Sequence, residues 1–321
     1  MSSLRHRTID VGGIRMHIAE QGVGPAVIMC HGFPGLWYSW RNQLPVLAAN
    51  GFRAITLDMR GYGRTDRPAD PGEYDRKSTV ADLVGLLDAL AIDDAVFVGH
   101  DFGAVLAWAL PQWAPGRVKA LIQLSVPRTR ISPHRPSGVF AEIATRHFFH
   151  MHYFQEKGPA DDELGAKPAL SLTKIFWALS GGYRYRDIFQ HPSDGRGYLD
   201  VLPEPPPLPW PWMSQEDLDH YAREFARTGF TGGLNWYRAA DHVWSEQRRL
   251  PELPITVPTS FITGERDPVQ QLSGPDPFQV MRDTVPGLDK IHIIPEAGHF
   301  VQMEAADQVN AIMLAFLSKF G

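Results

Sequence analysis

The chain has 321 residues, enough for about two domains or for one large domain with an insertion. Hydrophobic residues make up 44% and charged residues 21%, a balance that excludes intrinsic disorder of the whole chain. Lys and Arg number 31 against 36 Asp and Glu, so the net charge of −5 gives no basic excess to favour a nucleic-acid partner. The single cysteine, Cys30, excludes an internal disulfide and any multi-cysteine metal site.

Targeting signals are not evident from the composition of any segment. The N-terminal Met-Ser-Ser-Leu-Arg-His-Arg lacks the apolar core of a signal peptide. No stretch approaches the roughly 18 uninterrupted apolar residues that a membrane span needs. We therefore expect a soluble cytoplasmic protein with no membrane partner.

Short apolar runs alternate with helical patterns in the first part of the chain. Two short strands are expected around Gly12-Gly13, because apolar and polar residues alternate after these glycines. Further strands are predicted over 26–30, 52–57, 95–98 and 118–124, and helices over 78–91 and 104–113. Continuous apolar runs are typical of strands buried on both faces, so the alternation predicts an α/β fold with a parallel sheet.

The alternation stops near Arg128. The proline block 203–212 is incompatible with a helix or a central strand and predicts an extended connector, and Ser214 is a candidate N-cap for a helix over 215–227. Strand patterns return at 258–263 and 290–294, before a last helix over 305–317. We expect a core domain made of residues 1–127 and 251–321, interrupted by a helical cap domain of residues 128–250.

The strongest local motif is Gly99-His100-Asp101-Phe102-Gly103, which lies between a predicted strand and a predicted helix. Glycines at both ends permit a sharp turn that exposes the central side chain as a nucleophile. A carboxylate with a reference pKa of about 3.9 is already ionised at pH 7, and it can attack a saturated carbon to form an ester. The alternative is a plain turn in which Asp101 only caps the helix.

Two further residues follow later strands in an order that suits a catalytic triad. Asp267 follows the strand that ends near Thr263, and His299 follows the strand that ends near Ile294. His299 would take a proton from the water that attacks the ester, and Asp267 would orient the imidazole. Glu265 is a weaker candidate for the acid, and the alternative for His299 is a surface-loop residue.

The segment His31-Gly-Phe-Pro34 ends another apolar strand. A loop at this place in the fold supplies a backbone N–H to an oxyanion hole, together with the N–H that follows the nucleophile. We expect these donors to be the amides of Phe33 and Phe102. The alternative is an aromatic-proline turn without a catalytic role.

The runs His31–Arg41, Asp58–Arg64 and Gly99–Gly103 together strongly resemble the epoxide hydrolases of the α/β-hydrolase superfamily. The resemblance covers about residues 5–318. It implies an α/β-hydrolase fold, in which a mostly parallel sheet is flanked by helices and carries an inserted helical cap. The segments Tyr153–Gly158 and Thr228–Arg238 look like the family segments that carry the two ring-opening tyrosines, here Tyr153 and Tyr237.

Chemistry supports two phenols beside the nucleophile. Opening an epoxide produces an alkoxide, and phenols with a reference pKa near 10 remain hydrogen-bond donors at pH 7. The alternative for Tyr153 and Tyr237 is that they are core residues of cap helices. With the resemblance, we expect hydrolysis of an epoxide to a vicinal diol, with a small epoxide and water as the only partners, no cofactor and no metal. The sequence is compatible with either a monomer or a homodimer. The expected substrate-pocket residues are His31, Pro34, Trp37, Trp236 and Phe300.

Three other functions compete with this interpretation. A haloalkane or haloacid dehalogenase shares the triad but needs donors for the halide, and neither Phe102 nor residues 104–107 (Ala-Val-Leu-Ala) provide them. A non-catalytic ligand receptor on the same fold predicts a damaged triad, whereas all three members are present. An esterase is disfavoured because Asp101 stands in place of serine. Two departures from the family pattern are Phe102, where Trp is common, and Gly35, where Glu is frequent.

Overall fold

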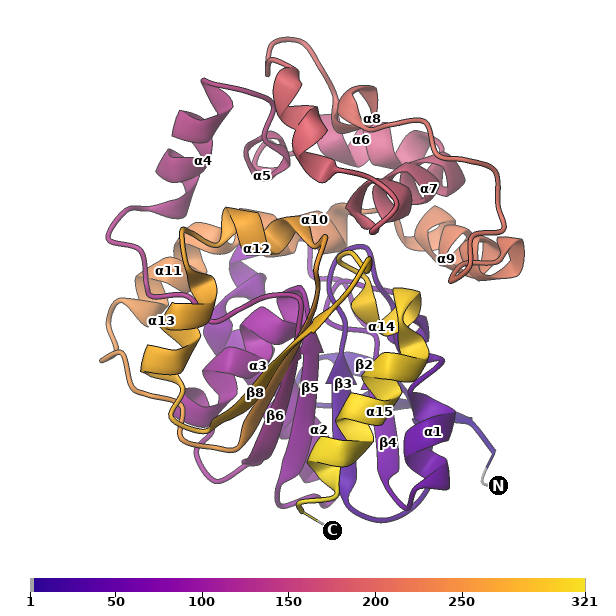
Figure 1. Cartoon of the computed structure of the whole chain (residues 1–321), viewed down its shortest axis with the longest axis vertical. Helices are drawn as coiled ribbons and strands as arrows, with labels where there is room; N and C mark the ends of the chain where they lie inside the picture. Colours follow the sequence, from indigo (N-terminus) through magenta and orange to yellow (C-terminus); the bar gives the residue numbers. More distant parts are fainter. Residues whose placement is uncertain (1–2, 321) are drawn as a thin grey trace.

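The computed structural model describes residues 3–320, without the side chain of Gln271, and is organised around an eight-stranded sheet (Figure 1). Its strands are β1 (Arg5–Asp10), β2 (Arg15–Gln21), β3 (Ala26–Cys30), β4 (Arg53–Leu57), β5 (Ala95–His100), β6 (Val118–Leu124), β7 (Thr259–Gly264) and β8 (Leu288–Ile294). Their order across the sheet is β1-β2-β4-β3-β5-β6-β7-β8. Strand β2 runs antiparallel to β1 and β4, and the other neighbouring strands pair in parallel. The predicted parallel α/β fold is thus confirmed.

Helices cover both faces of this sheet because its central strands are apolar on both sides. Consecutive residues such as Phe97 and Val98 belong to two separate hydrophobic clusters, one on each face. The first cluster is shared with α2 (Arg76–Ala89), α3 (Phe102–Trp113) and α13 (Pro277–Thr284), and the second with α1 (Leu44–Ala49) and α15 (Ala306–Leu317).

The chain between β6 and β7 contains no strand among its described elements and is dominated by helices. These are α4 (Pro136–Ala144), α5 (His150–Tyr153), α6 (Pro159–Ala166), α7 (Pro168–Leu179), the 3-10 helix η3 (Tyr185–Gln190), α8 (Tyr198–Val201), α9 (Gln215–Thr228), α10 (Thr231–Arg238) and α11 (Ala240–Gln247). In Figure 1, α4 to α9 lie above one end of the sheet. We call residues 128–250 the cap below; the division into two domains stays a prediction.

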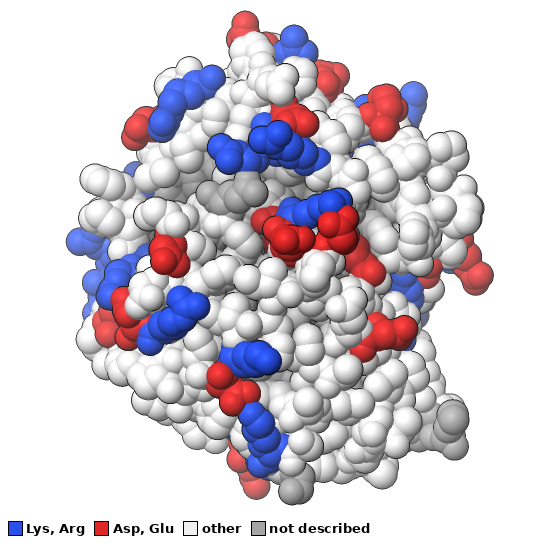
Figure 2. Space-filling model, viewed as in Figure 1, with Lys and Arg blue, Asp and Glu red and all other residues white. Residues whose placement is uncertain are grey.

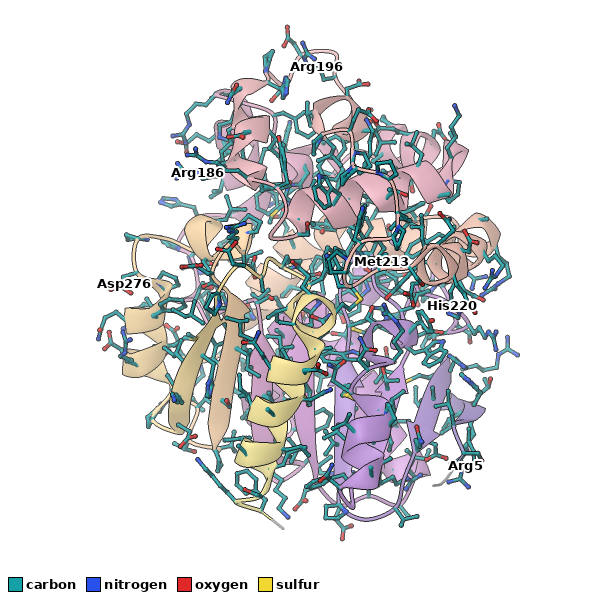
Figure 3. All side chains as sticks on the ribbon, turned by 45° about the vertical axis from the view of Figure 1, so that its right-hand side comes forward. Arg5, Arg186, Arg196, Met213, His220 and Asp276 are labelled. Atoms are coloured by element: carbon teal, nitrogen blue, oxygen red, sulfur yellow. The ribbon has the colours of Figure 1, made fainter. Side chains whose placement is uncertain are left out.

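Four short helices lie in the connections: η1 (Trp37–Trp40), η2 (Pro71–Tyr74), α12 (Pro268–Leu272) and α14 (Val301–Glu304). The predicted last helix starts one residue later than expected because Ala305, with φ −131° and ψ 46°, interrupts it after α14. The proline block forms the expected connector, closed by backbone hydrogen bonds between Trp210 and Met213. Met213 lies where the upper helices meet the sheet, whereas Arg186 and Arg196 lie on the outside of the cap (Figure 3).

The surface carries both charge signs. Acidic and basic side chains are intermixed over the face shown in Figure 2. Among residues 3–320, none of the helices has the length and apolar character required to cross a bilayer. In the same part of the chain, no group of three or more His, Cys, Asp or Glu side chains is arranged to hold a metal ion.

Candidate active site

Three side chains meet beyond the carboxyl ends of β5, β7 and β8. Asp101 directly follows β5, Asp267 precedes α12, and His299 lies in the loop after β8. The Nδ1 atom of His299 is 3.2 Å from Oδ1 of Asp267, and its Nε2 atom is 3.6 Å from Oδ2 of Asp101. The imidazole therefore lies between two carboxylates, in the geometry of a nucleophile, a base and an orienting acid.

The turn that presents Asp101 is strained and requires glycine neighbours. Asp101 has φ +53°, a conformation that is uncommon for a residue with a side chain. A Cβ at Gly99 would lie 2.6 Å from Cα of Ala104, and a Cβ at Gly32 would lie 2.6 Å from Cγ of Asp101. The close approach of these backbones fixes the carboxylate above the end of the sheet.

The Asp101 carboxylate receives a hydrogen bond from the predicted oxyanion loop. The backbone N–H of Phe33 donates to Oδ1 of Asp101 at 2.7 Å. Burial on its own would raise the pKa of Asp101, but the His299 imidazole and the Phe33 N–H outweigh it and hold the pKa below its usual value. Among the described residues, the Phe102 amide makes no hydrogen bond to this carboxylate, so its expected role stays a prediction.

His299 is strongly biased towards its charged form. Burial would lower the pKa of His299, but the charges of Asp267 and Asp101 and the hydrogen bonds to them raise it to about 10. The two flanking carboxylates therefore stabilise an imidazolium at neutral pH when both are ionised.

This charge cluster predicts a pH-dependent stability. Because the pKa of His299 is about 10 in the folded state and near 6.5 when unperturbed, its stabilising contribution is complete below about pH 6.5. That contribution is lost as the pH rises through 10. We expect the free energy of unfolding in urea to fall more steeply from pH 7 to pH 9.5 in the unsubstituted protein than in a His299→Gln variant. Equal slopes for the two proteins would contradict the charged cluster.

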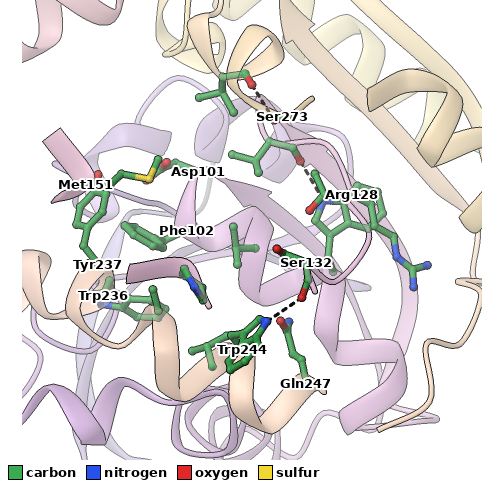
Figure 4. A pocket seen from close by; sticks show the side chains of 18 of the residues that line it. Asp101, Phe102, Arg128, Ser132, Met151, Trp236, Tyr237, Trp244, Gln247 and Ser273 are labelled. Carbon is green, nitrogen blue, oxygen red and sulfur yellow. Dashed lines mark hydrogen bonds between the residues drawn. The ribbon is translucent and has the colours of Figure 1, made fainter. Parts of the chain in front are cut away.

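A cavity of about 610 Å³ opens in front of Asp101. Trp236 and Tyr237 from α10, Phe102 from α3 and Met151 from α5 line it, as Figure 4 shows. The Phe102 ring contacts the Tyr237 ring edge-on, with 4.7 Å between ring centres. Burial, and then the Asp101 charge, raise the pKa of Tyr237 well above its ordinary value, so its hydroxyl keeps its proton.

One of the five expected pocket residues lines this cavity in the described part of the chain. Trp236 is in the cavity lining, whereas His31, Pro34, Trp37 and Phe300 are absent from it among the described residues. Each of these four is buried in the interior instead.

The reasons differ from residue to residue. His31 turns under its own loop, where its Nε2 accepts a hydrogen bond from the Met59 N–H at 3.0 Å. Trp37 packs edge-on against His6 in the second hydrophobic cluster. Phe300 packs edge-on against Phe176 of α7, with ring centres 4.9 Å apart.

The two expected tyrosines differ in whether they line the cavity. Tyr237 reaches the cavity, but Tyr153 is not among the described residues that line it. Burial, and then the nearby carboxylate of Glu163, raise the pKa of Tyr153. The cavity is instead lined by His150, three residues earlier and one helical turn away. His150 has no sequence signal of its own, because the direction of side chains around a single turn of helix cannot be read from so short a pattern.

Two smaller sequence questions are settled by local packing. Glu265 is exposed and accepts a hydrogen bond from the Glu296 N–H at 3.3 Å, so Asp267 is the carboxylate that faces His299. Gly35 closes a tight turn through its N–H to the Gly32 carbonyl at 2.6 Å, and a Cβ there would lie 2.9 Å from the same oxygen. The missing side chain at position 35 is thus explained by crowding in this turn.

The loop that carries His299 is joined to the cap by hydrogen bonds. The His299 N–H donates to the carbonyl of Leu179, the last residue of α7, at 2.9 Å. The carboxylate of Glu304 accepts the N–H groups of Gly298 at 3.0 Å, Phe300 at 3.0 Å and Gly181 at 2.8 Å. Burial raises the pKa of Glu304 to about 7 in spite of these three donors. We call Leu179, Gly181 and Glu304 the cap joint.

Comparisons with known proteins agree with this architecture. The family described as alpha/beta hydrolase fold matches residues 25–151. The chain is 41% identical to epoxide hydrolase A of Mycobacterium tuberculosis, over 99% of this chain and 98% of that protein. It is 39% identical to epoxide hydrolase 1 of Siraitia grosvenorii, over 100% of both. The crystal structure of epoxide hydrolase A from Mycobacterium thermoresistibile matches with a TM-score of 0.92 and 38% identity, over 98% of both chains.

The sheet order and the carboxylate–imidazole–carboxylate site define a hydrolase of the α/β-hydrolase fold. Within that class, the similarity to known epoxide hydrolases over nearly the full length identifies the family. The chain belongs to the epoxide hydrolases of this fold.

Proposed function

We propose that this enzyme opens an epoxide in two covalent stages, with Asp101 as the nucleophile. The observation that carries the proposal is the placement of Asp101, hydrogen-bonded to Phe33, in a cavity that it shares with Tyr237 and His299. An Asp101 oxygen attacks one ring carbon, the carbon–oxygen bond of the ring breaks, and an ester forms. The departing oxygen takes the proton of the Tyr237 hydroxyl, which leaves a hydroxyalkyl ester and a tyrosinate.

Ester formation changes the electrostatics around His299. The ester of Asp101 is neutral, so His299 loses one of the two carboxylates that raise its pKa. Its imidazolium then returns a proton to the tyrosinate and becomes a neutral base. The attack itself thereby prepares the group needed for the second stage.

Hydrolysis restores the starting state. Neutral His299 takes a proton from water, and the resulting hydroxide attacks the carbonyl carbon of the ester. The Phe33 N–H stabilises the oxyanion that develops on Asp101 Oδ1, while Asp267 stabilises the imidazolium. Breakdown of the tetrahedral intermediate releases the vicinal diol, with Asp101 ionised and His299 protonated as before. Tyr153 has no role in this scheme because it does not line the cavity.

A substrate panel tests this proposal most directly. The panel contains styrene oxide, a trans-disubstituted aromatic epoxide, a long-chain aliphatic epoxide, fluoroacetate and a chloroalkane, and is scored for diol and for halide release. We expect diol from at least one epoxide, and a loss of about 100-fold or more in Tyr237→Phe, because one donor to the developing oxyanion is removed. Halide release without diol would replace the proposal by dehalogenation.

A further inference from the structure

Three tyrosines line the cavity in the described part of the chain, and an epoxide oxygen can accept two hydrogen bonds. The Tyr74 hydroxyl is hydrogen-bonded to the Pro68 carbonyl, and the Tyr185 hydroxyl is paired with His150 and Tyr198. Tyr237 supplies one donor. The other expected phenol, Tyr153, is not among the described residues that line the cavity. A second protein donor to this oxygen would have to be another residue that lines the cavity with Tyr237 and Asp101.

His150 meets the geometric requirements for such a donor. It begins α5 and lines the same cavity as Asp101, Tyr237 and His299. Its ring stands edge-on to the Tyr237 ring, with 6.1 Å between ring centres and planes at 86°. The charges of Asp101 and His299 both act on it. His150 is 8% exposed, so its side chain is almost entirely enclosed although it lines the cavity.

Hydrogen bonds within the cap determine which ring nitrogen is free. The Nδ1 atom of His150 is 2.9 Å from the Tyr185 hydroxyl, which is in turn 3.1 Å from the Tyr198 hydroxyl. All three side chains are buried. When Tyr185 donates to Nδ1, the proton of a neutral imidazole must sit on Nε2. No hydrogen-bond partner of Nε2 is found among the described residues, so in this tautomer the Nε2–H is available to a substrate.

Burial keeps the ring neutral at physiological pH. It lowers the pKa of His150 to about 4, even though the Asp101 charge acts in the opposite direction. A neutral imidazole can still polarise a carbon–oxygen bond by donating its N–H, as a phenol does. It does not compete with Tyr237 for the role of proton source.

We propose that His150 is a catalytic residue of ring opening, whose Nε2–H donates to the epoxide oxygen alongside the Tyr237 hydroxyl. The proposal rests on the two-stage mechanism above and replaces the expected pair of tyrosines by one imidazole and one phenol. As Asp101 attacks, the oxygen gains negative charge and takes the proton of Tyr237. His150 keeps its own proton throughout and only stabilises that charge. Tyr185 is a positioning residue, because it acts through Nδ1 of His150.

Single-turnover kinetics with an epoxide that yields diol in the panel separates ring opening from ester hydrolysis. In His150→Phe, which preserves an aromatic ring without a donor, we expect the rate of ester formation at saturating substrate to fall about 100-fold or more. His150→Gln carries an N–H at a similar reach and should recover most of that rate. Tyr153→Phe is the matched control, since it removes a hydroxyl three residues away, and should retain the original rate.

Three results would overturn the assignment of His150. These are ester formation at the original rate in His150→Phe, an equal loss in His150→Gln, or a loss of that size in Tyr153→Phe. If His150→Phe fails to fold, Tyr185→Phe gives the test: loss of one hydrogen bond should slow ring opening about tenfold, and an unchanged rate contradicts the proposal. Absence of any ester or diol in the unsubstituted protein would instead refute the two-stage mechanism itself, and this proposal with it.

Discussion

Replacement of Asp101 by alanine is expected to lower kcat/KM for epoxides by at least about 10⁴-fold, the scale on which loss of a nucleophile acts in comparable hydrolases. The reason is structural as well as chemical. Asp101 occupies the strained turn after β5, and its carboxylate is oriented by the Phe33 N–H. No other carboxylate in the described cavity lining is placed to replace it beside His299.

The measurement is diol formation over several hours, with the folded state of Asp101→Ala checked by thermal unfolding. Glu265→Ala serves as the control, because Glu265 is an exposed carboxylate in the neighbouring loop and lies outside the cavity. We expect the control to retain its activity. If Asp101→Ala kept more than a small fraction of the original rate, water would have to attack the epoxide directly and the covalent scheme would be wrong.

Replacement of His299 by glutamine should have an equally large effect on a different step. Ring opening needs the Asp101 carboxylate and the oxygen donors, whereas ester hydrolysis needs a base beside the ester. His299 is the imidazole at that place, 3.6 Å from Oδ2 of Asp101. We therefore expect His299→Gln to form one ester per protein chain and then to stop, with hydrolysis slowed by about 10²- to 10⁴-fold.

Mass spectrometry of the intact protein provides the measurement. His299→Gln incubated with an epoxide should gain the full mass of that epoxide, because the addition releases no leaving group. Peptide mapping should locate the added mass on Asp101. The double variant Asp101→Ala, His299→Gln is the control and should gain nothing. Rapid diol release by His299→Gln, or an adduct on another residue, is the outcome that the two-stage scheme does not allow.

The fold, and the meeting of Asp101, Asp267 and His299 at one edge of the sheet, can be predicted from sequence because the signals are local and repeated. Strand β6 was placed at its observed bounds from one apolar run, and α3 and α9 were placed to within two residues. Asp101 and His299 each stand directly after a strand of the parallel sheet or in the loop that follows one. Parallel strands bring their carboxyl ends to one edge, so their following residues must converge there.

The residues that line the pocket were harder to predict from sequence, because the lining depends on the direction of side chains in loops and short helices. His31 is next to the oxyanion loop in sequence, yet its ring hydrogen-bonds the Met59 amide beneath that loop. In α5, the direction of each side chain around a single turn of helix decides that His150, and not Tyr153, lines the cavity with Asp101. The motif predicts which segment approaches the site, whereas the orientation of its residues depends on tertiary contacts such as that between His150 and Tyr185 of η3.

The cap lines the substrate pocket and, through the cap joint, also holds the loop that carries His299. His299 is anchored through its backbone to Leu179, and Glu304 holds the loop on either side of His299 against Gly181. An exchange of caps between related enzymes, undertaken to alter substrate scope, therefore also exchanges one attachment point of the loop that carries His299. In chimeras whose junction lies inside residues 179–182, the rate of ester hydrolysis should fall more than the rate of ring opening. Chimeras that transfer this stretch together with Glu304 should retain both rates.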